Sequence, residues 1–451
     1  MVDIDKATKG SIETVKSYLQ TEGLESSRST KVWRMICLIA QLIVGCTFVF
    51  SSLMKGIDPT GTAIKIGEYA SSFGIPLSDD LSSFFAIFLN VLEGLLGIAL
   101  LLGLVPRLTS GILLVLMSGM TLLTLYIVIY NPVKDCGCFG DALKISNTAT
   151  FLKNLILLPL TILLWIKRSR WVRLLDESWD VTLIIVSMLL LINFNMYPVK
   201  HLPAIDFRPY KVGSNLKELT LTGGSEGEYE YLFVYEKEGK EKTFSLEELS
   251  NIDDSWTYVR DETRVIKEAQ QPAGSDFVLL REDGSNAMEQ IAYEKGRALL
   301  LITPDFNKIS RKLLNRILEF QKRSDEKLYL AVSNGGEIWE SEKNKPFEHE
   351  FKEILFLDKT TAKTVIRSNP GLLVIKEGKI VRKLSAKDFD KLMKKDSFVK
   401  NPYQPVEKYS KFKSYFYSFG PLAVYAIILV ILGWIHGNQR RKLRRSTFTR
   451  E

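Results

Sequence analysis

Long apolar runs separated by short polar segments dominate the first 200 residues and return once near the C-terminus. A run of about 20 apolar residues, rising 1.5 Å per helical residue, crosses a hydrocarbon core of about 30 Å. Five such runs in one stretch are difficult to bury in a water-soluble helical core. The pattern therefore predicts six membrane-spanning helices. Their ranges are 32–54, 84–104, 108–130, 149–166, 180–198 and 415–436.

The segment between the fifth and sixth helices has a different pattern. Residues 199–272 are rich in aromatic and β-branched runs, such as the stretch from Tyr229 to Glu236, which predicts strands joined by hairpin turns. Residues 273–400 alternate short apolar runs typical of strands with helical patterns in a mixed β and α order. This order predicts an α/β domain with a mixed sheet and helices on both faces. The predicted strands are 275–280, 298–302, 328–332, 354–357, 372–375 and 378–381, and the helices 310–323 and 386–395.

Basic residues set the orientation, because Lys and Arg favour the cytoplasmic side of a membrane. Basic clusters lie in 1–31, in 167–173 and in 437–451, and six crossings place all three on one side. We therefore expect a multi-pass protein of the bacterial inner membrane, in contact with lipid, with both termini cytoplasmic and residues 199–413 extracytoplasmic. The loops 55–80 and 131–148 fall on the outer side. About 30 mostly polar residues precede the first helix, so no cleavable signal peptide is expected.

The overall composition is informative only when the membrane part and the outer segment are considered separately. The 451 residues are 46% hydrophobic and 25% charged, with mean hydropathy +0.03 and net charge +8. These values exclude a disordered chain, a collagen-like repeat and a small disulfide scaffold. The near-zero mean hydropathy averages an apolar membrane part with a polar outer segment, which has many charged residues but a net charge close to zero. Since topology accounts for the basic excess, no nucleic-acid partner is expected.

The clearest chemical signal is a pair of cysteines in the second outer loop. All four cysteines lie in the first 140 residues, and Cys136 and Cys138 flank Gly137. A disulfide persists on the oxidising side of a bacterial inner membrane. A bond between residues i and i+2 closes a small ring, for which glycine is best suited, and a strained bridge is more easily reduced. The flanking residues of the motif are Asp135, Gly137, Phe139, Gly140 and Asp141.

Three interpretations of Cys136 and Cys138 stay open: a redox-active pair, a structural disulfide, and a metal site. The metal site would use both thiols with Asp135 and Asp141, but no histidine lies near in the sequence. No metal is therefore assigned. The carboxylates raise the thiol pKa and the start of the following helix lowers it, and the sequence does not decide between them.

Ionisable residues inside the predicted helices form a second candidate site. A carboxyl facing lipid is costly, so we expect Glu93 to face the bundle interior with a partner, and Lys153 with Asn154 beside it is the nearest by depth. Glu93 is then either a proton- or quinone-linked site or a structural polar contact, and a quinone is the one cofactor considered. Cys46, at similar depth, is a candidate relay thiol, against ordinary packing of a lone cysteine. Cys37 is expected to be inert.

The outer α/β segment carries a resemblance. The matching residues are Asp276-Phe277, Asp283-Gly284, the unit 299–320, Asn369-Pro370 and Gly378. They resemble a thioredoxin-like domain of the peroxiredoxin or membrane-tethered thiol-disulfide type, over about 125 residues. In that family a Cys-x-x-Cys opens the first long helix and faces a cis-proline. Here residues 303–308 hold no cysteine, whereas Pro370 fits the cis-proline position. The resemblance implies a domain that cannot exchange dithiols itself, and that binds peptide, docks a partner or is only structural.

The membrane part carries a second resemblance. Its residues are the motif 135–141, the segment 55–59 after the first helix, and Glu93 followed by Leu95, Leu96 and Gly97. Residues 32–170 resemble the DoxX-like family, in the branch of the methylamine-utilisation protein MauE. This resemblance implies a four-helix bundle that assists maturation of a disulfide-rich periplasmic enzyme beside a thioredoxin-like partner. Here both parts lie on one chain, whereas the fifth and sixth helices and the missing outer cysteines depart from MauE.

The leading hypothesis is an inner-membrane protein that supports thiol-redox or maturation chemistry of an exported protein partner through Cys136 and Cys138. The runner-up is a non-catalytic membrane scaffold with a structural cysteine loop, and a small-molecule transporter is a weaker third. The sequence leaves catalysis by the chain itself and its oligomeric state open. The expected divisions are 1–31 (cytoplasmic segment), 32–170 (four-helix domain), 180–198 (fifth helix), 199–272 (β-rich linker domain), 273–400 (thioredoxin-like domain), 415–436 (sixth helix) and 437–451 (basic tail).

Overall fold

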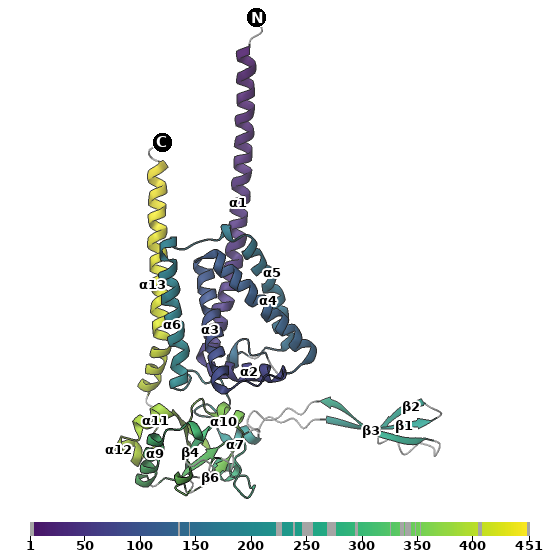
Figure 1. The fold of residues 1–451 in the computed structure, drawn as a ribbon, viewed down its shortest axis with the longest axis vertical. Coiled ribbons are helices and arrows are strands. Elements are labelled where there is room, and N and C mark those ends of the chain that lie inside the picture. Colours follow the sequence, from purple (N-terminus) through teal and green to yellow (C-terminus); the bar gives the residue numbers. More distant parts are fainter. Residues whose placement is uncertain are drawn as a thin grey trace. The chain divides into compact units, whose positions relative to one another are not determined.

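The computed structural model divides into two compact units, Met1–Phe207 with Val406–Glu451, and Arg208–Pro405. Figure 1 traces the long helices of the first unit and the sheets of the second. The structure describes residues 4–133, 136–143, 145–221, 228–237, 240–245, 256–267, 277–293, 296–324, 326–333, 338, 344–347, 349–351, 353–404 and 408–448.

The first unit is built from long helices, and six helices of the described chain are long and apolar enough to span a membrane. The spans are Ser29–Ile57, Asp79–Leu102, Pro106–Tyr130, Asn147–Ile166, Glu177–Lys200 and Ser414–Asn438. The six predicted membrane helices are thus confirmed, and the chain is a multi-pass membrane protein. The α-helices of this unit are α1 (Ile4–Ile57), α2 (Pro59–Ser72), α3 (Asp79–Leu102), α4 (Pro106–Tyr130), α5 (Asn147–Ile166), α6 (Asp180–Lys200) and α13 (Lys408–Phe448).

One part of the expected outer loops is helical instead. Helix α2 occupies much of the segment expected to be a loop after the first span. Asp58 caps α2, because its side chain accepts a hydrogen bond from the Gly61 N–H at 3.2 Å, and Pro59 takes the first helical position. These two residues also mark the end of α1 at Ile57. The hydropathy pattern missed α2 because the segment is too polar and too short to resemble a membrane span.

Close packing holds α1 against α3, and glycines make it feasible. A Cβ atom added to Gly97 would lie 2.8 Å from the backbone nitrogen of Val49 and 3.0 Å from the carbonyl oxygen of Gly45. Helix α4 packs on α5, α3 on α6, and α6 on α13. Without a hydrophobic driving force between helices in lipid, such small-residue contacts carry much of the packing.

Buried amides satisfy backbone groups at one end of this bundle. The Gln41 side chain donates to the carbonyl of Leu100 at 2.9 Å and accepts from the backbone N–H of Val172 at 3.0 Å. In the middle of the bundle, Asn90 donates to the side-chain oxygen of Asn195 at 3.2 Å. Since no water is available in a hydrocarbon core, these contacts replace hydration of the polar groups.

The second unit holds a five-stranded mixed sheet in the order β6-β5-β4-β7-β8. Strands β4, β5 and β6 are parallel, whereas β7 pairs antiparallel with both β4 and β8. The mixed α/β sheet predicted for this segment is thus confirmed. Its elements are α8 (Met288–Tyr293), β4 (Arg297–Thr303), α9 (Arg311–Arg323), β5 (Leu328–Val332), β6 (Ile354–Phe356), α10 (Lys359–Val365), β7 (Gly371–Lys376), β8 (Lys379–Ser385), α11 (Ala386–Leu392) and α12 (Asp396–Lys400).

One predicted strand of this domain is not a strand. Of the expected run 275–280, Ser275 and Asp276 lie outside the described residues, and only Leu280 forms bridges, to Asn286 and Phe356. The bridge to Phe356 places this residue beside the edge strand β6. Phe277 and Leu279 of this apolar run are buried, although only Leu280 pairs with the sheet.

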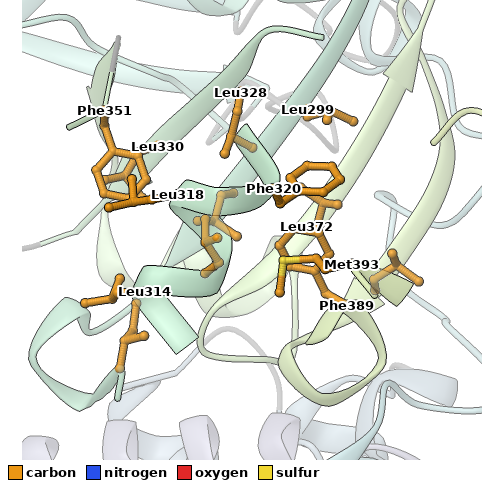
Figure 2. Packing of buried hydrophobic residues seen from close by; sticks show 14 of the residues in the cluster. Leu299, Leu314, Leu318, Phe320, Leu328, Leu330, Phe351, Leu372, Phe389 and Met393 are labelled. Carbon is orange, nitrogen blue, oxygen red and sulfur yellow. The ribbon is translucent and has the colours of Figure 1, made fainter. Parts of the chain in front are cut away.

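The core of the second unit fills the space between the sheet and the helices α9 and α11. Figure 2 shows Leu299 and Leu372 of the sheet on the same side as Phe320 of α9 and Phe389 of α11. The rings of Phe320 and Phe389 meet edge to face at 5.4 Å. Burial of these large side chains is the main favourable contribution to the stability of this sheet.

A second, smaller sheet lies within residues 199–272, the part of the chain that was expected to be β-rich. It has the order β2-β1-β3 and is antiparallel, with β1 (Glu228–Lys237), β2 (Lys240–Ser245) and β3 (Thr257–Lys267). The turn expected at residues 238–239 lies outside the described residues, although the pairing of Lys237 with Lys240 is that of a hairpin. The short helix α7 (Leu216–Leu221) precedes this sheet.

Candidate functional site

The cysteine loop, residues 136–143, connects α4 with α5. The sulfur atoms of Cys136 and Cys138 lie 3.0 Å apart, and both cysteines are free thiols. Gly137 between them has φ +65°, a left-handed conformation that glycine adopts without a steric penalty. Its carbonyl accepts a hydrogen bond from the Gly140 N–H at 2.9 Å, which closes a tight turn. The predicted motif residue Asp135 lies outside the described residues.

Three helices fix this loop through its backbone and one ring. The hydroxyl of Tyr69 on α2 donates to the Cys136 carbonyl at 2.6 Å. On α1, the Ser51 hydroxyl lies 2.8 Å from the Cys138 carbonyl. The ring of Phe139 contacts Phe50 of α1 with centroids 5.4 Å apart, and the Lys153 ammonium of α5 lies 4.8 Å from the same ring. The loop is thus held without a disulfide.

Glu93 faces the bundle interior, and its partner is Lys55. The Lys55 ammonium donates to both carboxylate oxygens of Glu93, at 2.7 and 2.9 Å, and both side chains are buried. The Ser51 hydroxyl lies 2.9 Å from Glu93 Oε2 as well as near the cysteine loop. Because a hydroxyl has one proton, Ser51 donates to either the carboxylate or the Cys138 carbonyl at a given moment. Ser51 therefore connects the ion pair to the cysteine loop.

The sequence-based partner of Glu93 was Lys153, and the structure assigns that role to Lys55. Helix α1 continues to Ile57, so Lys55 lies within the bundle rather than in a loop. Asn154 donates to the Thr124 hydroxyl of α4 at 3.2 Å. Cys46 is exposed on the surface of the unit and does not line the cavity described below.

A small cavity brings the two predicted sites together. It has a volume of about 40 Å³ and lies between the cysteine loop and helices α1, α3, α4 and α5. Its polar lining combines residues from both candidate sites with three that the sequence did not single out as site residues, and Met117 and Met120 contribute sulfur. The polar and charged lining residues are Thr47, Ser51, Lys55, Glu93, Cys138, Lys153 and Asn154.

The two thiols of the loop are electrostatically unequal. A hydrogen bond from Cys136, assisted by the charges of Lys153 and Lys55, lowers the pKa of Cys138 to about 6 against the opposing effect of burial. The same hydrogen bond, together with burial, raises the pKa of Cys136. The shared proton therefore resides on Cys136, and Cys138 ionises first. A thiolate is the form of cysteine that attacks a disulfide.

The sequence missed Lys55, Ser51 and Tyr69 as members of this site. Ser51 and Lys55 are four residues apart and therefore lie on one face of α1. The sequence signal that could have identified Ser51 and Lys55 was this polar face at the end of an apolar run, because Glu93 in the next membrane span needs a polar partner. Tyr69 had none, because α2 itself was not expected.

In the second unit, the segment after β4 lies against the Asn369-Pro370 turn. The Asn369–Pro370 peptide bond is cis. The Asn369 side chain accepts from the Thr303 hydroxyl at 2.7 Å and donates to the Asp305 carbonyl at 2.7 Å. Among the residues that the structure describes, no three His, Cys, Asp or Glu side chains form a metal-binding group.

Comparison with characterised proteins and with solved structures finds no match. Residues 229–268, which include most of β1 and all of β3, match a family model described as a domain of unknown function (DUF8463). Residues 33–167 hold the first four membrane helices, the cysteine loop and the Lys55–Glu93 pair, and this part of the chain matches the family of methylamine utilisation protein MauE.

Proposed function

We propose that this protein supports thiol-redox or maturation chemistry of an exported partner protein at the outer face of a bacterial inner membrane. The observation that carries the proposal is the approach of the Cys136 and Cys138 sulfurs to 3.0 Å in a loop that other contacts already hold. A pair at this distance needs little movement to pass between dithiol and disulfide. Since Tyr69 and Ser51 anchor the loop, a disulfide is not needed to fix it.

The match of residues 33–167 to the family of methylamine utilisation protein MauE supports the resemblance on which this proposal draws, and the matched residues include both Cys136 and Cys138. We do not extend the proposal to methylamine itself. The match to MauE leaves out helices α6 and α13 and the whole second unit. The exported partner of this protein can therefore differ from the partner of MauE.

The second unit is proposed to be a thioredoxin-like docking module without thiols of its own. The parallel β4-α9-β5 unit, the antiparallel β7-β8 hairpin and the contact between Asn369 and the segment after β4 support this interpretation. The basic clusters that flank the spans support a position of this unit outside the cytoplasm. Added protease should then degrade residues 201–413 in spheroplasts, and protection of this segment would contradict the orientation.

The redox state of the pair in cells tests the function. Free thiols are trapped by alkylation in intact cells that express the wild type, Cys136→Ser or Cys138→Ser. We expect the wild-type pair to change between dithiol and disulfide under mild reducing and oxidising challenge, and either substitution to prevent maturation of the partner. A pair that stays oxidised under reducing challenge, with substitutions that have no effect, indicates the alternative, a scaffold with a structural disulfide.

A further inference from the structure

The surroundings of the two thiols differ in a way that assigns them different tasks. Cys136 is 8% exposed and packs in an apolar cluster with Ile127 and Val133. Cys138 is more exposed and lines the cavity that also holds Lys55 and Lys153. Cys136 thus lies inside the apolar cluster, whereas Cys138 packs against the edge of that cluster and also lies beside two cations.

The two cations are not equivalent. Lys55 is bonded to both oxygens of Glu93, whose negative charge opposes the effect of Lys55 on Cys138. Lys153 lies over the ring of Phe139, and the described part of the chain provides it with no carboxylate within ion-pair distance. Both charges act on Cys138, and that of Lys153 does so without a bonded carboxylate to oppose it.

Resting on the proposed exchange function, we infer that Cys138 is the attacking cysteine, that Cys136 is the resolving cysteine, and that Lys153 is the positioning residue that favours the thiolate at Cys138. The ionisable groups around Cys138 are Lys55 from α1, Glu93 from α3, Lys153 from α5 and Cys136 from the loop itself, and Lys65 from α2 lies beside Gly137. The phenol of Tyr69 from α2 is bonded to the loop backbone. The lowered pKa of Cys138 agrees with this assignment.

The substrate class is a disulfide of an exported protein, and the exchange balances without a further reagent. The Cys138 thiolate attacks one sulfur of the partner disulfide, a Cys138–partner disulfide forms, and the second partner sulfur leaves as a thiolate. Cys136 gives its proton to that thiolate and attacks Cys138 Sγ, which is 3.0 Å away. The first partner sulfur leaves and takes a proton from water. The pair loses two electrons to the partner.

Site-resolved alkylation tests the role of Lys153. The full-length protein in detergent is treated with iodoacetamide across pH 4–10, and mass spectrometry follows each cysteine separately. We expect half-maximal alkylation of Cys138 near pH 6. Lys153→Gln should raise this midpoint by about one pH unit, because loss of a nearby positive charge shifts a thiol pKa on this scale. Lys153→Arg should restore it.

Lys167 provides a matched control, because it follows the end of α5 opposite the loop and its ammonium lies 4.5 Å from the centroid of the Trp33 ring. Lys167→Gln should leave the Cys138 midpoint unchanged. If Lys153→Gln also leaves it unchanged, the positioning role is wrong.

Oxidised glutathione as a probe disulfide tests the assignment of the thiols. The Cys136→Ser variant should accumulate a mixed disulfide at Cys138, whereas Cys138→Ser should form little at Cys136. A faster adduct at Cys136 overturns the assignment but leaves the exchange function intact. Absence of an adduct from both variants contradicts the exchange function itself.

Discussion

Replacement of Glu93 by Gln tests whether the buried ion pair stabilises the membrane bundle. The substitution keeps the size of the side chain but replaces one of the two oxygens that accept from Lys55 with an NH2 donor. It also leaves the Lys55 ammonium without a counter-charge, with 8% of the Lys55 side chain exposed. Breaking a buried pair by removal of one partner costs about 3–5 kcal/mol. For a unit of this size, 1 kcal/mol corresponds to about 2–4 °C in Tm. We therefore expect Tm to fall by about 6–20 °C.

The measurement is thermal unfolding of the full-length protein in detergent, followed by circular dichroism at the helix band. Glu68→Gln is the matched control, because it breaks the Lys65–Glu68 pair, which has a similar distance of 3.0 Å but is partly exposed. That change should cost less than about 1 kcal/mol. The double variant Lys55→Met/Glu93→Leu removes both charges and should recover most of the lost stability. Equal shifts for Glu93→Gln and Glu68→Gln would refute the reasoning.

Three further predictions concern packing and hydrogen bonds. Gly97→Ala should destabilise the bundle by about 1–3 kcal/mol in the same unfolding assay, because the new methyl meets backbone atoms of α1, whereas Gly111→Ala, with no atom within 4 Å, should be neutral or stabilising. Ser51→Ala should lower Tm by about 2–4 °C through loss of its hydrogen bond of about 1 kcal/mol. Tyr403→Phe should cost the second unit about 1–2 kcal/mol in urea unfolding at pH 7, because the phenol donates to Glu326 at 2.9 Å. Burial raises the pKa of Tyr403, so the difference between wild type and variant should persist up to about pH 10 and decline above it.

The helices and most strands were predictable because both rest on burial patterns local in the sequence. Membrane spans need about 20 consecutive apolar residues, and all six were recovered. Strand β5 has the bounds that were expected, and β4 differs by one residue at each end. For both strands, a run of consecutive apolar residues in the sequence predicts a strand buried on both faces.

Side-chain pairing was not predictable to the same degree. Depth along a helix identified Glu93 as a bundle-facing residue but selected Lys153, because depth says nothing about which helix faces the carboxylate. The pairing with Lys55 depends on where α1 ends and on the rotation of α1 against α3, which close glycine packing decides. For the same reason, similar depth did not bring Cys46 to the cavity. Rotation about a helix axis is set by tertiary contacts, which a single sequence does not contain.

The Lys55–Glu93 pair also has a consequence for biosynthesis. The two residues are 38 positions apart in the chain. At about 5–20 residues per second, a ribosome makes Lys55 roughly 2–8 s before Glu93. During this interval α1 has a cation near one end without its counter-charge, which favours keeping that end at the membrane–water interface. Completion of α3 then supplies the carboxylate that allows α1 to settle into the bundle, so the ion pair gives these two helices an order of assembly.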